Sequence, residues 1–188
     1  MSAVKTNAGQ GLGNIKPGQT VNAFGKKFGK KFSARIEARK HKVRKTAVVK
    51  RVWAEIDKSL FKEAVAFLCE LYPMPHFSVA SGYDLGETIE LIYHFALGFG
   101  GNLEEFMFSL KVVLPKSDLV LESITDLIPG ALISERELQE MLGVKIKGIP
   151  DSRRLFLPKE IPKGVYPWRK DSKGPERLVR NLNEVGKK

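Results

Sequence analysis

The sequence has little cysteine and little histidine, and this scarcity limits the chemistry that it can carry. Its 188 residues include one cysteine, Cys69, and three histidines that lie far apart in the sequence. An internal disulfide, a CxxC pair and a thiolate cage for zinc or an iron–sulfur cluster are therefore excluded. Because no histidine has a partner at metal-ligand spacing, we expect this protein to hold no metal and no other cofactor.

Long apolar runs and catalytic signatures are also missing. No stretch approaches the roughly 20 apolar residues that span a bilayer, and residues 1–20 lack the apolar core of a signal peptide, so we expect a soluble, cytoplasmic protein. The stretch GQGLGNIKPG lacks both a preceding strand and the GKS or GKT ending of a phosphate-binding loop. GxSxG and HExxH motifs are absent. A stand-alone enzyme is therefore our third hypothesis, since it has no candidate nucleophile, base or metal.

The net charge of +11 is spread unevenly along the sequence. Residues 1–52 contain 14 lysines and arginines against one acid, residues 53–145 contain 6 against 15, and residues 146–188 contain 12 against 5. An acidic middle between two basic ends is not typical of a nucleic-acid-binding domain, although a basic arm could bind DNA or RNA. The lysines interleaved with phenylalanines in FGKKFGKKF could contact nucleic acid or an anionic membrane, but we favour the solvated face of a helix.

Hydrophobic periodicity predicts one α+β domain over residues 21–143, preceded by a flexible tail over residues 1–20. Its expected elements, in sequence order, are a helix over 21–32, a hairpin of two strands over 34–56, a helix from Asp57 to Tyr72 that Asp57 caps and Pro73 stops, and three strands within 76–114 with a glycine-rich loop at 98–101. These elements predict a two-layer sandwich, in which a small, mainly antiparallel sheet carries the helices on one face.

A short helix is predicted over residues 134–142. Ser134 and Glu137 fit a capping box, Ile133 and Leu138 stand where a hydrophobic staple would lie, and Gly143 is placed to end the helix in the left-handed conformation. A catalytic carboxylate pair of two glutamates in this helix is disfavoured, because residues two apart on a helix do not face each other.

The composition of residues 144–188 predicts an extended, irregular segment that docks on a partner. Six glycines and prolines within residues 148–167 forbid a long helix or a central strand, yet ten aliphatic and aromatic residues lie between Val144 and Trp168. An irregular segment this apolar must lie against a surface, and we favour a partner protein. The alternative is that the segment wraps its own domain.

The residues assigned to partner docking lie on the predicted helix and in this segment. Arginine and tryptophan are residue types that dominate interface energetics. One arginine of the pair at 153–154 is expected to bind an acid of the same protein at 135, 137 or 151, and the other to reach the partner or to fix the segment. The predicted docking residues are Glu135, Arg136, Glu137, Asp151, Arg153, Arg154, Leu155, Phe156, Pro158, Tyr166, Trp168 and Arg169.

Short motifs between residues 123 and 171 are similar to the signature region of one family. They include SITD at 123–126, PGA at 129–131, ERE at 135–137, MLGV at 141–144, PD at 150–151, RRL at 153–155, LP at 157–158 and RKD at 169–171. On these residues the sequence resembles the 30-kDa subunit of the respiratory-chain NADH dehydrogenase, which is complex I. Leu132, Ile133 and Ile149 stand where complex I relatives usually carry an aromatic pair and a histidine, which favours the branch of archaeal and bacterial membrane-bound hydrogenases and related sulfur-reducing complexes.

The resemblance implies a structural and assembly subunit, with no catalytic residue and no cofactor of its own, in the peripheral arm of a membrane-bound, ion-translocating oxidoreductase. It implies two partners, a hydrogenase-like large subunit and a small subunit that holds an iron–sulfur cluster. It also implies a peripheral place on the cytoplasmic side of the membrane, which the protein would reach only through the complex. The alternative is a small nucleic-acid-binding protein that acts through residues 1–52.

Overall fold

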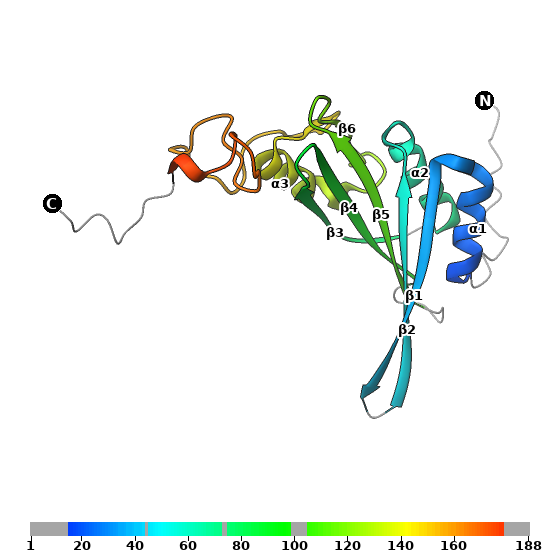
Figure 1. Ribbon diagram of the computed structural model, residues 1–188. Helices are drawn as coiled ribbons and strands as arrows, with labels where there is room; N and C mark the ends of the chain where they lie inside the picture. Colours follow the sequence, from blue (N-terminus) through cyan, green and yellow to red (C-terminus); the bar gives the residue numbers. More distant parts are fainter. Residues whose placement is uncertain (1–14, 44, 73–74, 99–104, 179–188) are drawn as a thin grey trace, which may run out of the picture.

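The computed structural model describes residues 15–43, 45–72, 75–98 and 105–178 of the protein. Seven strands and three α-helices lie within these residues (Figure 1). The strands are β1 (Phe32–Val43), β2 (Lys45–Ile56), β3 (His76–Asp84), β4 (Thr88–Leu97), β5 (Phe106–Pro115), β6 (Val120–Glu122) and β7 (Lys145–Lys147). The helices are α1 (Pro17–Phe28), α2 (Phe61–Leu71) and α3 (Leu132–Leu142).

Five strands form the main sheet in the order β1-β2-β5-β4-β3. Neighbouring strands run antiparallel, except that β2 and β5 are parallel over five residue pairs, from Arg51 with Met107 to Glu55 with Lys111. A second sheet consists of β6 and β7, which are parallel. The predicted hairpin and the mainly antiparallel sheet are confirmed. Because β7 belongs to this second sheet, regular structure continues past the domain boundary predicted at residue 143.

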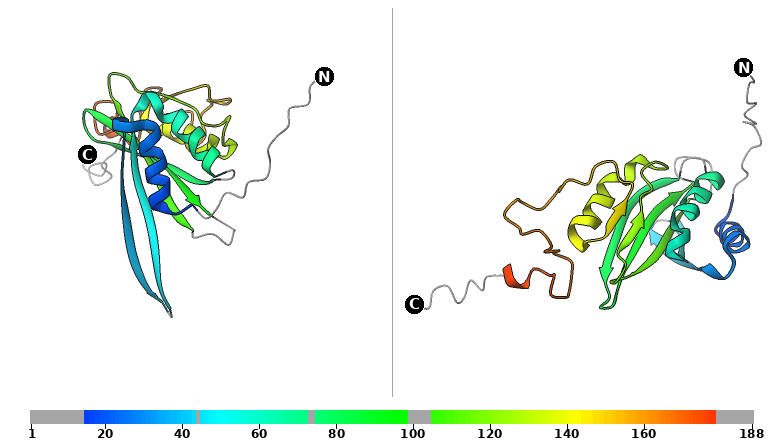
Figure 2. Two further views of the ribbon diagram at one scale, coloured as in Figure 1. Left: turned by 90° about the vertical axis from the view of Figure 1, so that its right-hand side faces the viewer. Right: turned by 90° about the horizontal axis from the view of Figure 1, so that it is seen from above.

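All three helices pack on one face of the main sheet, as predicted. The ring of Phe24 in α1 lies 5.2 Å from that of Phe108 in β5, and the ring of Phe61 in α2 lies 4.7 Å from that of Tyr93 in β4. Helix α3 covers Gly82 of β3, where its leucines leave no room for a Cβ atom. The strand registers put these three sheet positions on the same face, and Figure 2 shows α2 and α3 together above it. The fold is therefore a two-layer α+β sandwich.

The first helix begins earlier than its hydrophobic spacing predicts. Pro17 is its first residue, and the backbone N–H of Lys16 donates to the side-chain oxygen of Gln19 at 2.8 Å. Proline suits this position because its missing N–H would have no helical partner. Residues 17–20, which the sequence analysis placed in the flexible tail, are therefore helical. Gly29, with φ of 56°, ends the helix four residues before the predicted end.

The second helix begins later than its prediction. The carboxylate of Asp57 accepts a hydrogen bond from the backbone N–H of Ser59 at 2.9 Å, but it caps a 3-10 turn over Lys58–Leu60. Helix α2 itself begins at Phe61, after Leu60, without a side-chain cap. Pro73, as well as the glycines at 100 and 101, lies outside the described residues.

The third helix contradicts the predicted capping box and staple. It begins at Leu132, two residues before the predicted cap, and it has no side-chain cap. The backbone enters it from a 3-10 turn over Pro129–Ala131, so Ser134 already lies inside the helix and cannot serve as its cap. Ile133 is half exposed and forms no staple. The predicted end is confirmed, since Gly143 has φ of 73° and its N–H donates to the carbonyl of Gln139.

Candidate docking site

Glu135 joins α3 to the loop that follows β6. Its side chain is fully buried and accepts hydrogen bonds from the Ser123 hydroxyl at 2.6 Å, the Ile124 amide at 3.0 Å and the Tyr93 hydroxyl at 3.5 Å. Burial raises the pKa of Glu135 above its ordinary value, and the hydrogen bonds oppose this only in part. The structure thus places this predicted docking residue in the interior, while Glu137 stays half-buried on the helix.

Glu140, which the sequence analysis missed, holds the irregular segment against α3. Its carboxylate accepts hydrogen bonds from three consecutive backbone amides, those of Leu155 at 3.0 Å, Phe156 at 2.8 Å and Leu157 at 2.9 Å. Although burial alone would raise the pKa of Glu140, these amides lower it below its ordinary value. Charge-assisted bonds of this kind are among the stronger hydrogen bonds in proteins.

Arg136 holds the preceding part of the segment. Its guanidinium donates to the carbonyl of Arg153 at 2.8 and 3.0 Å and to that of Arg154 at 3.3 Å, and it lies 3.3 Å from the carboxylate of Asp151. Arg136 and Glu140 are four residues apart and therefore share one side of the helix. This spacing is the one signal in the sequence that could have identified Glu140.

The two arginines at 153 and 154 make different contacts, as predicted. The side chain of Arg153 donates to the carboxylate of Asp151 at 2.9 and 2.8 Å, and together with Arg136 it holds the pKa of that carboxyl well below its usual range. The side chain of Arg154 donates to carbonyls farther along the segment, those of Pro158 at 3.2 Å and Ile161 at 2.7 Å. One arginine thus binds a predicted acid and the other fixes the segment.

Residues 166–171 return to the end of α3. The ring of Tyr166 lies over Gly143, where a Cβ atom would be 2.5 Å from it. The N–H of Trp168 donates to the carbonyl of Met141 at 3.0 Å. The side chain of Arg169 is buried and donates to the carbonyl of Leu142 at 3.3 Å. Arg169 therefore supports the segment from inside and offers no surface to a partner.

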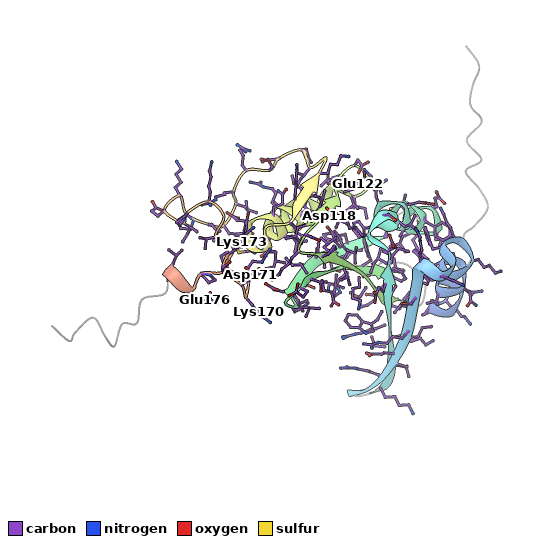
Figure 3. All side chains as sticks on the ribbon, turned by 45° about the horizontal axis from the view of Figure 1, so that its top comes forward. Asp118, Glu122, Lys170, Asp171, Lys173 and Glu176 are labelled. Carbon is purple, nitrogen blue, oxygen red and sulfur yellow. The ribbon has the colours of Figure 1, made fainter. Side chains whose placement is uncertain are left out.

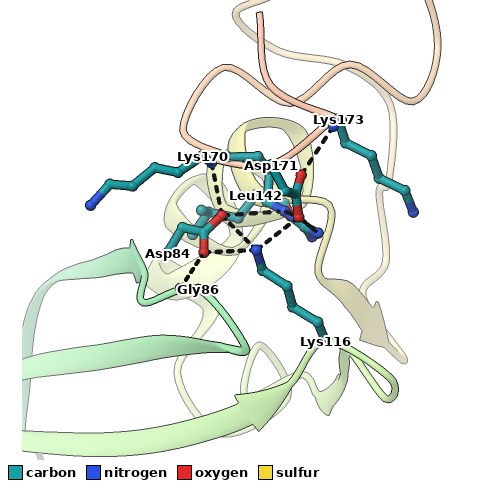
Figure 4. A network of polar contacts seen from close by, with 8 residues as sticks. Asp84, Gly86, Lys116, Leu142, Lys170, Asp171 and Lys173 are labelled. Atoms are coloured by element: carbon teal, nitrogen blue, oxygen red, sulfur yellow. Dashed lines mark hydrogen bonds and ion pairs between the residues drawn. The ribbon is translucent and has the colours of Figure 1, made fainter.

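A polar network fastens this part of the segment to the main sheet (Figure 4). Asp84, at the end of β3, accepts from Lys116 at 2.8 Å and from the backbone N–H of Lys170 at 2.8 Å. Lys116 also donates to Asp171 at 2.7 Å, and Arg169 binds the same carboxylate. The Arg169 guanidinium, Lys116 and a backbone amide lower the pKa of Asp171 well below its usual range. Acids and bases from three parts of the sequence meet at this point.

The remaining predicted docking residues are exposed. Phe156 is 53% exposed and Trp168 is 41% exposed, which is unusual for side chains of this size. Figure 3 shows the side chains along this segment projecting outward from a loose loop, with Lys170, Lys173 and Glu176 among them. We call the exposed run around Phe156 the docking ridge; it consists of Arg153, Arg154, Leu155, Phe156 and Pro158.

The segment therefore lies on its own domain, which was the alternative left open, and still presents an apolar and basic surface.

Among the described residues, no group of three or more histidines, cysteines, aspartates or glutamates is placed to hold a metal ion. Within the same residues no helix has both the length and the apolar character to cross a bilayer. His94 lies between the hydroxyls of Ser81 and Ser109, as expected for a structural histidine.

Known proteins resemble this one in sequence and in fold. It is 39% identical over 132 residues to the membrane-bound hydrogenase subunit beta of Pyrococcus furiosus, a match that spans 70% of this protein and 76% of that one. It is 33% identical over 135 residues to a subunit of the F420H2 dehydrogenase of Methanosarcina mazei, spanning 70% and 82%. A component of the membrane-bound sulfane sulfur reductase, an archaeal respiratory membrane complex, has the same fold, with a TM-score of 0.60, 18% identity and coverage of 90% and 89%.

The family is settled by a match over most of the described residues. Residues 54–177, which include α2, α3, the docking ridge and the polar network, match the model of the respiratory-chain NADH dehydrogenase 30-kDa subunit. The match contains every motif on which the resemblance was based. The protein belongs to the family of the respiratory-chain NADH dehydrogenase 30-kDa subunit.

Proposed function

We propose that the protein is a non-catalytic, cofactor-free structural subunit in the peripheral arm of a membrane-bound, ion-translocating oxidoreductase complex of the hydrogenase or complex I type. Its partners in this proposal are the hydrogenase-like large subunit and the iron–sulfur small subunit, on the cytoplasmic side of the membrane. Family membership supports the proposal, as do the names of its relatives, which are subunits of such complexes. These comparisons offer no support for the nucleic-acid alternative.

The observation that carries the proposal is the construction of the docking ridge. Three amides bound to Glu140 and two carbonyls bound to Arg136 hold an irregular segment in one conformation while Phe156 remains exposed. Holding a segment in its bound conformation reduces the entropy that docking would otherwise cost. Two arginines precede Phe156 in the ridge and Trp168 is also exposed, and arginine and tryptophan are among the residue types that contribute most to protein–protein binding. We assign the ridge and Trp168 to the contact with the large subunit.

Co-purification with a tagged large subunit tests this assignment. The variant Leu155→Ser with Phe156→Ser removes the apolar part of the ridge while keeping the backbone bonds to Glu140. The control, Tyr83→Ser with Leu85→Ser, removes two comparably exposed apolar side chains near the β3–β4 turn. We expect the ridge variant to be folded but absent from the purified complex, and the control to be retained. Normal occupancy of the ridge variant would refute the docking role.

Truncation after the ridge is a poorer test than these point substitutions. Deletion of residues 159–188 also removes Arg169 and Asp171, which bind the end of α3 and the polar network of the protein's own domain. Loss of assembly by such a variant could therefore reflect a destabilised domain. Point substitutions on exposed side chains separate docking from folding.

A further inference from the structure

The β1–β2 hairpin extends far beyond the rest of the main sheet. Its two strands pair along all twelve residues of each, but β2 meets β5 only over Arg51–Glu55. The rest of the hairpin is a two-stranded ribbon that projects away from the domain, in a different direction from the C-terminal segment (Figure 1). Such a ribbon is marginally stable by itself in water, so its length calls for a function.

The outer strand of this ribbon is an open sheet edge. In the strand order β1 comes first and pairs with β2 alone. Every second residue of an edge strand directs its backbone N–H and C=O away from the sheet, where another strand can pair with them. The side chains of residues 33–40 in β1 are exposed or half-buried. No further strand among the described residues pairs with the outer edge of β1.

The side chains along this edge select the kind of strand that fits. Arg35, Glu37 and Arg39 share one face, and the arginine side chains are 72% and 66% exposed, while Glu37 lies 3.5 Å and 3.9 Å from them. The other face carries Ile36, which is 45% exposed, and Ala38. A strand opposite this edge would therefore place two of its side chains against cations on one face and two against apolar groups on the other.

Charge opposes pairing of this edge with a second copy of itself. Residues 33–43 contain four lysines and arginines and one glutamate, so two copies would bring together two strands of the same sign. In the antiparallel pairing centred on Glu37, each Arg35 would face Arg39 of the other copy, and like charges directly opposite are destabilising. Phosphates of nucleic acid or lipid would satisfy the cations, but they cannot donate hydrogen bonds to the carbonyls of the edge.

We propose that the outer edge of β1 over residues 33–40 binds an extended acidic segment of another protein by strand addition. Acidic side chains four residues apart lie against Arg35 and Arg39, and apolar side chains between them lie against Ile36 and Ala38. The main-chain hydrogen bonds supply affinity and the alternate side chains supply specificity, as in other cases of strand addition. Strand β1 is at the edge of the main sheet opposite to β3, away from the C-terminal segment (Figure 1), and the proposal does not depend on the ridge.

Binding of a short peptide to the full-length protein tests the proposal. The probe is a peptide with the core Glu-Val-Thr-Val-Glu, and the control peptide has lysine in place of both glutamates. In NMR spectra of the labelled protein, we expect the acidic peptide to cause saturable shifts and slower hydrogen exchange at the amides of β1, and the lysine peptide to cause neither. Absence of shifts with the acidic peptide, or equal shifts with both peptides, would overturn the proposal.

A charge reversal sharpens the test. The variant Arg35→Glu with Arg39→Glu should bind the acidic peptide roughly tenfold more weakly or worse and should gain binding of the lysine peptide. The control, Lys26→Glu with Lys30→Glu, makes the same change of net charge at exposed positions outside the hairpin and should bind like the wild type. Unchanged affinity in the hairpin variant refutes the proposal. Stronger binding of a DNA duplex or of phosphatidylglycerol vesicles at this edge, or a dimer in solution, also refutes it.

Discussion

Glu140→Gln should detach residues 155–157 from α3 without unfolding the domain. Glu140 is 8% exposed, and its carboxylate accepts three backbone hydrogen bonds of 2.8 to 3.0 Å. Glutamine offers one carbonyl oxygen in place of two and carries no charge, so at least one bond is lost and the others weaken. Hydrogen bonds to charged groups contribute about 1.5–3 kcal/mol each, and released amides can bond to water instead, so we expect a local loss of about 2–4 kcal/mol.

Hydrogen exchange of individual amides measures this loss directly. A change of about 2–4 kcal/mol should speed exchange at Leu155, Phe156 and Leu157 by roughly 30-fold to 1,000-fold, because exchange follows the free energy of local opening. The amides of β4 and β5 should exchange as before. Glu137→Gln, a neutralised and half-buried position on the same helix, is the matched control. If exchange of the three amides stayed within about twofold of the wild type, the carboxylate would not be what holds the segment.

The same interaction makes a prediction for pH. The pKa of Glu140 is lower in the folded protein than its ordinary value of 4.5. A carboxyl of this kind contributes stability that is complete above the unfolded-state pKa and is lost as the pH falls through the lower folded-state pKa. Protection of the three amides should therefore persist below about pH 4.5 and disappear at more acid pH. Loss of protection between about pH 6 and about pH 5 would contradict the assignment.

Three further substitutions test other contacts of the site. Burial raises the pKa of Glu135, so its stabilising contribution is present at low pH and is lost as the pH rises through the folded-state pKa. Glu135→Gln should therefore remove a decline in unfolding free energy above about pH 4.5, measured by urea denaturation; the same decline in the variant would assign it to another group. Gly143→Ala should lower the melting temperature more than Gly86→Ala, because both positions have positive φ, at a cost of about 1 kcal/mol each, but only the first also forces a Cβ atom against Tyr166. Equal losses would exclude that steric conflict. Asp84→Asn should cost about 1.5–3 kcal/mol in urea denaturation, since it removes one of the two carboxylates that bind Lys116 and Arg169; an unchanged midpoint would show that the Asp84 carboxylate adds no stability.

Strands were the most predictable part of the fold, because their patterns are local. Alternation from Phe106 to Leu114 marks β5 as a strand with one face in the core, and the structure buries those residues. Asp57 before an apolar helical stripe is likewise a local signal. The start of α3 was not predictable in the same way, since the 3-10 turn begun by Pro129 extends the helix backward and removes Ser134 from the cap position.

The irregular segment that holds the candidate docking residues was predictable from the sequence, but the contact that each residue makes was not. An irregular apolar segment with two arginines indicates a surface that needs a partner, and the exposure of Phe156 agrees with this. Which residues face inward depends on where the segment returns to α3, and no local pattern encodes that. Glu135 and Arg169 look like surface residues in the sequence, yet both are buried. Their hydrogen bonds come in part from residues far along the sequence, since Ser123 donates to Glu135 and Arg169 donates to the carbonyl of Leu142.

The parallel pairing of β2 with β5 has a consequence for how the protein folds. Between the two strands lie α2, β3 and β4, so the contact from Arg51 to Met107 closes a loop of more than fifty residues. Contacts of such long range are slow to form, because the entropy of loop closure must be lost before the strands gain anything. On the ribosome, the hairpin emerges well before β5 exists, and both of its edges then remain unpaired. The excess of lysine and arginine on the hairpin would keep neighbouring nascent polypeptides apart during this interval.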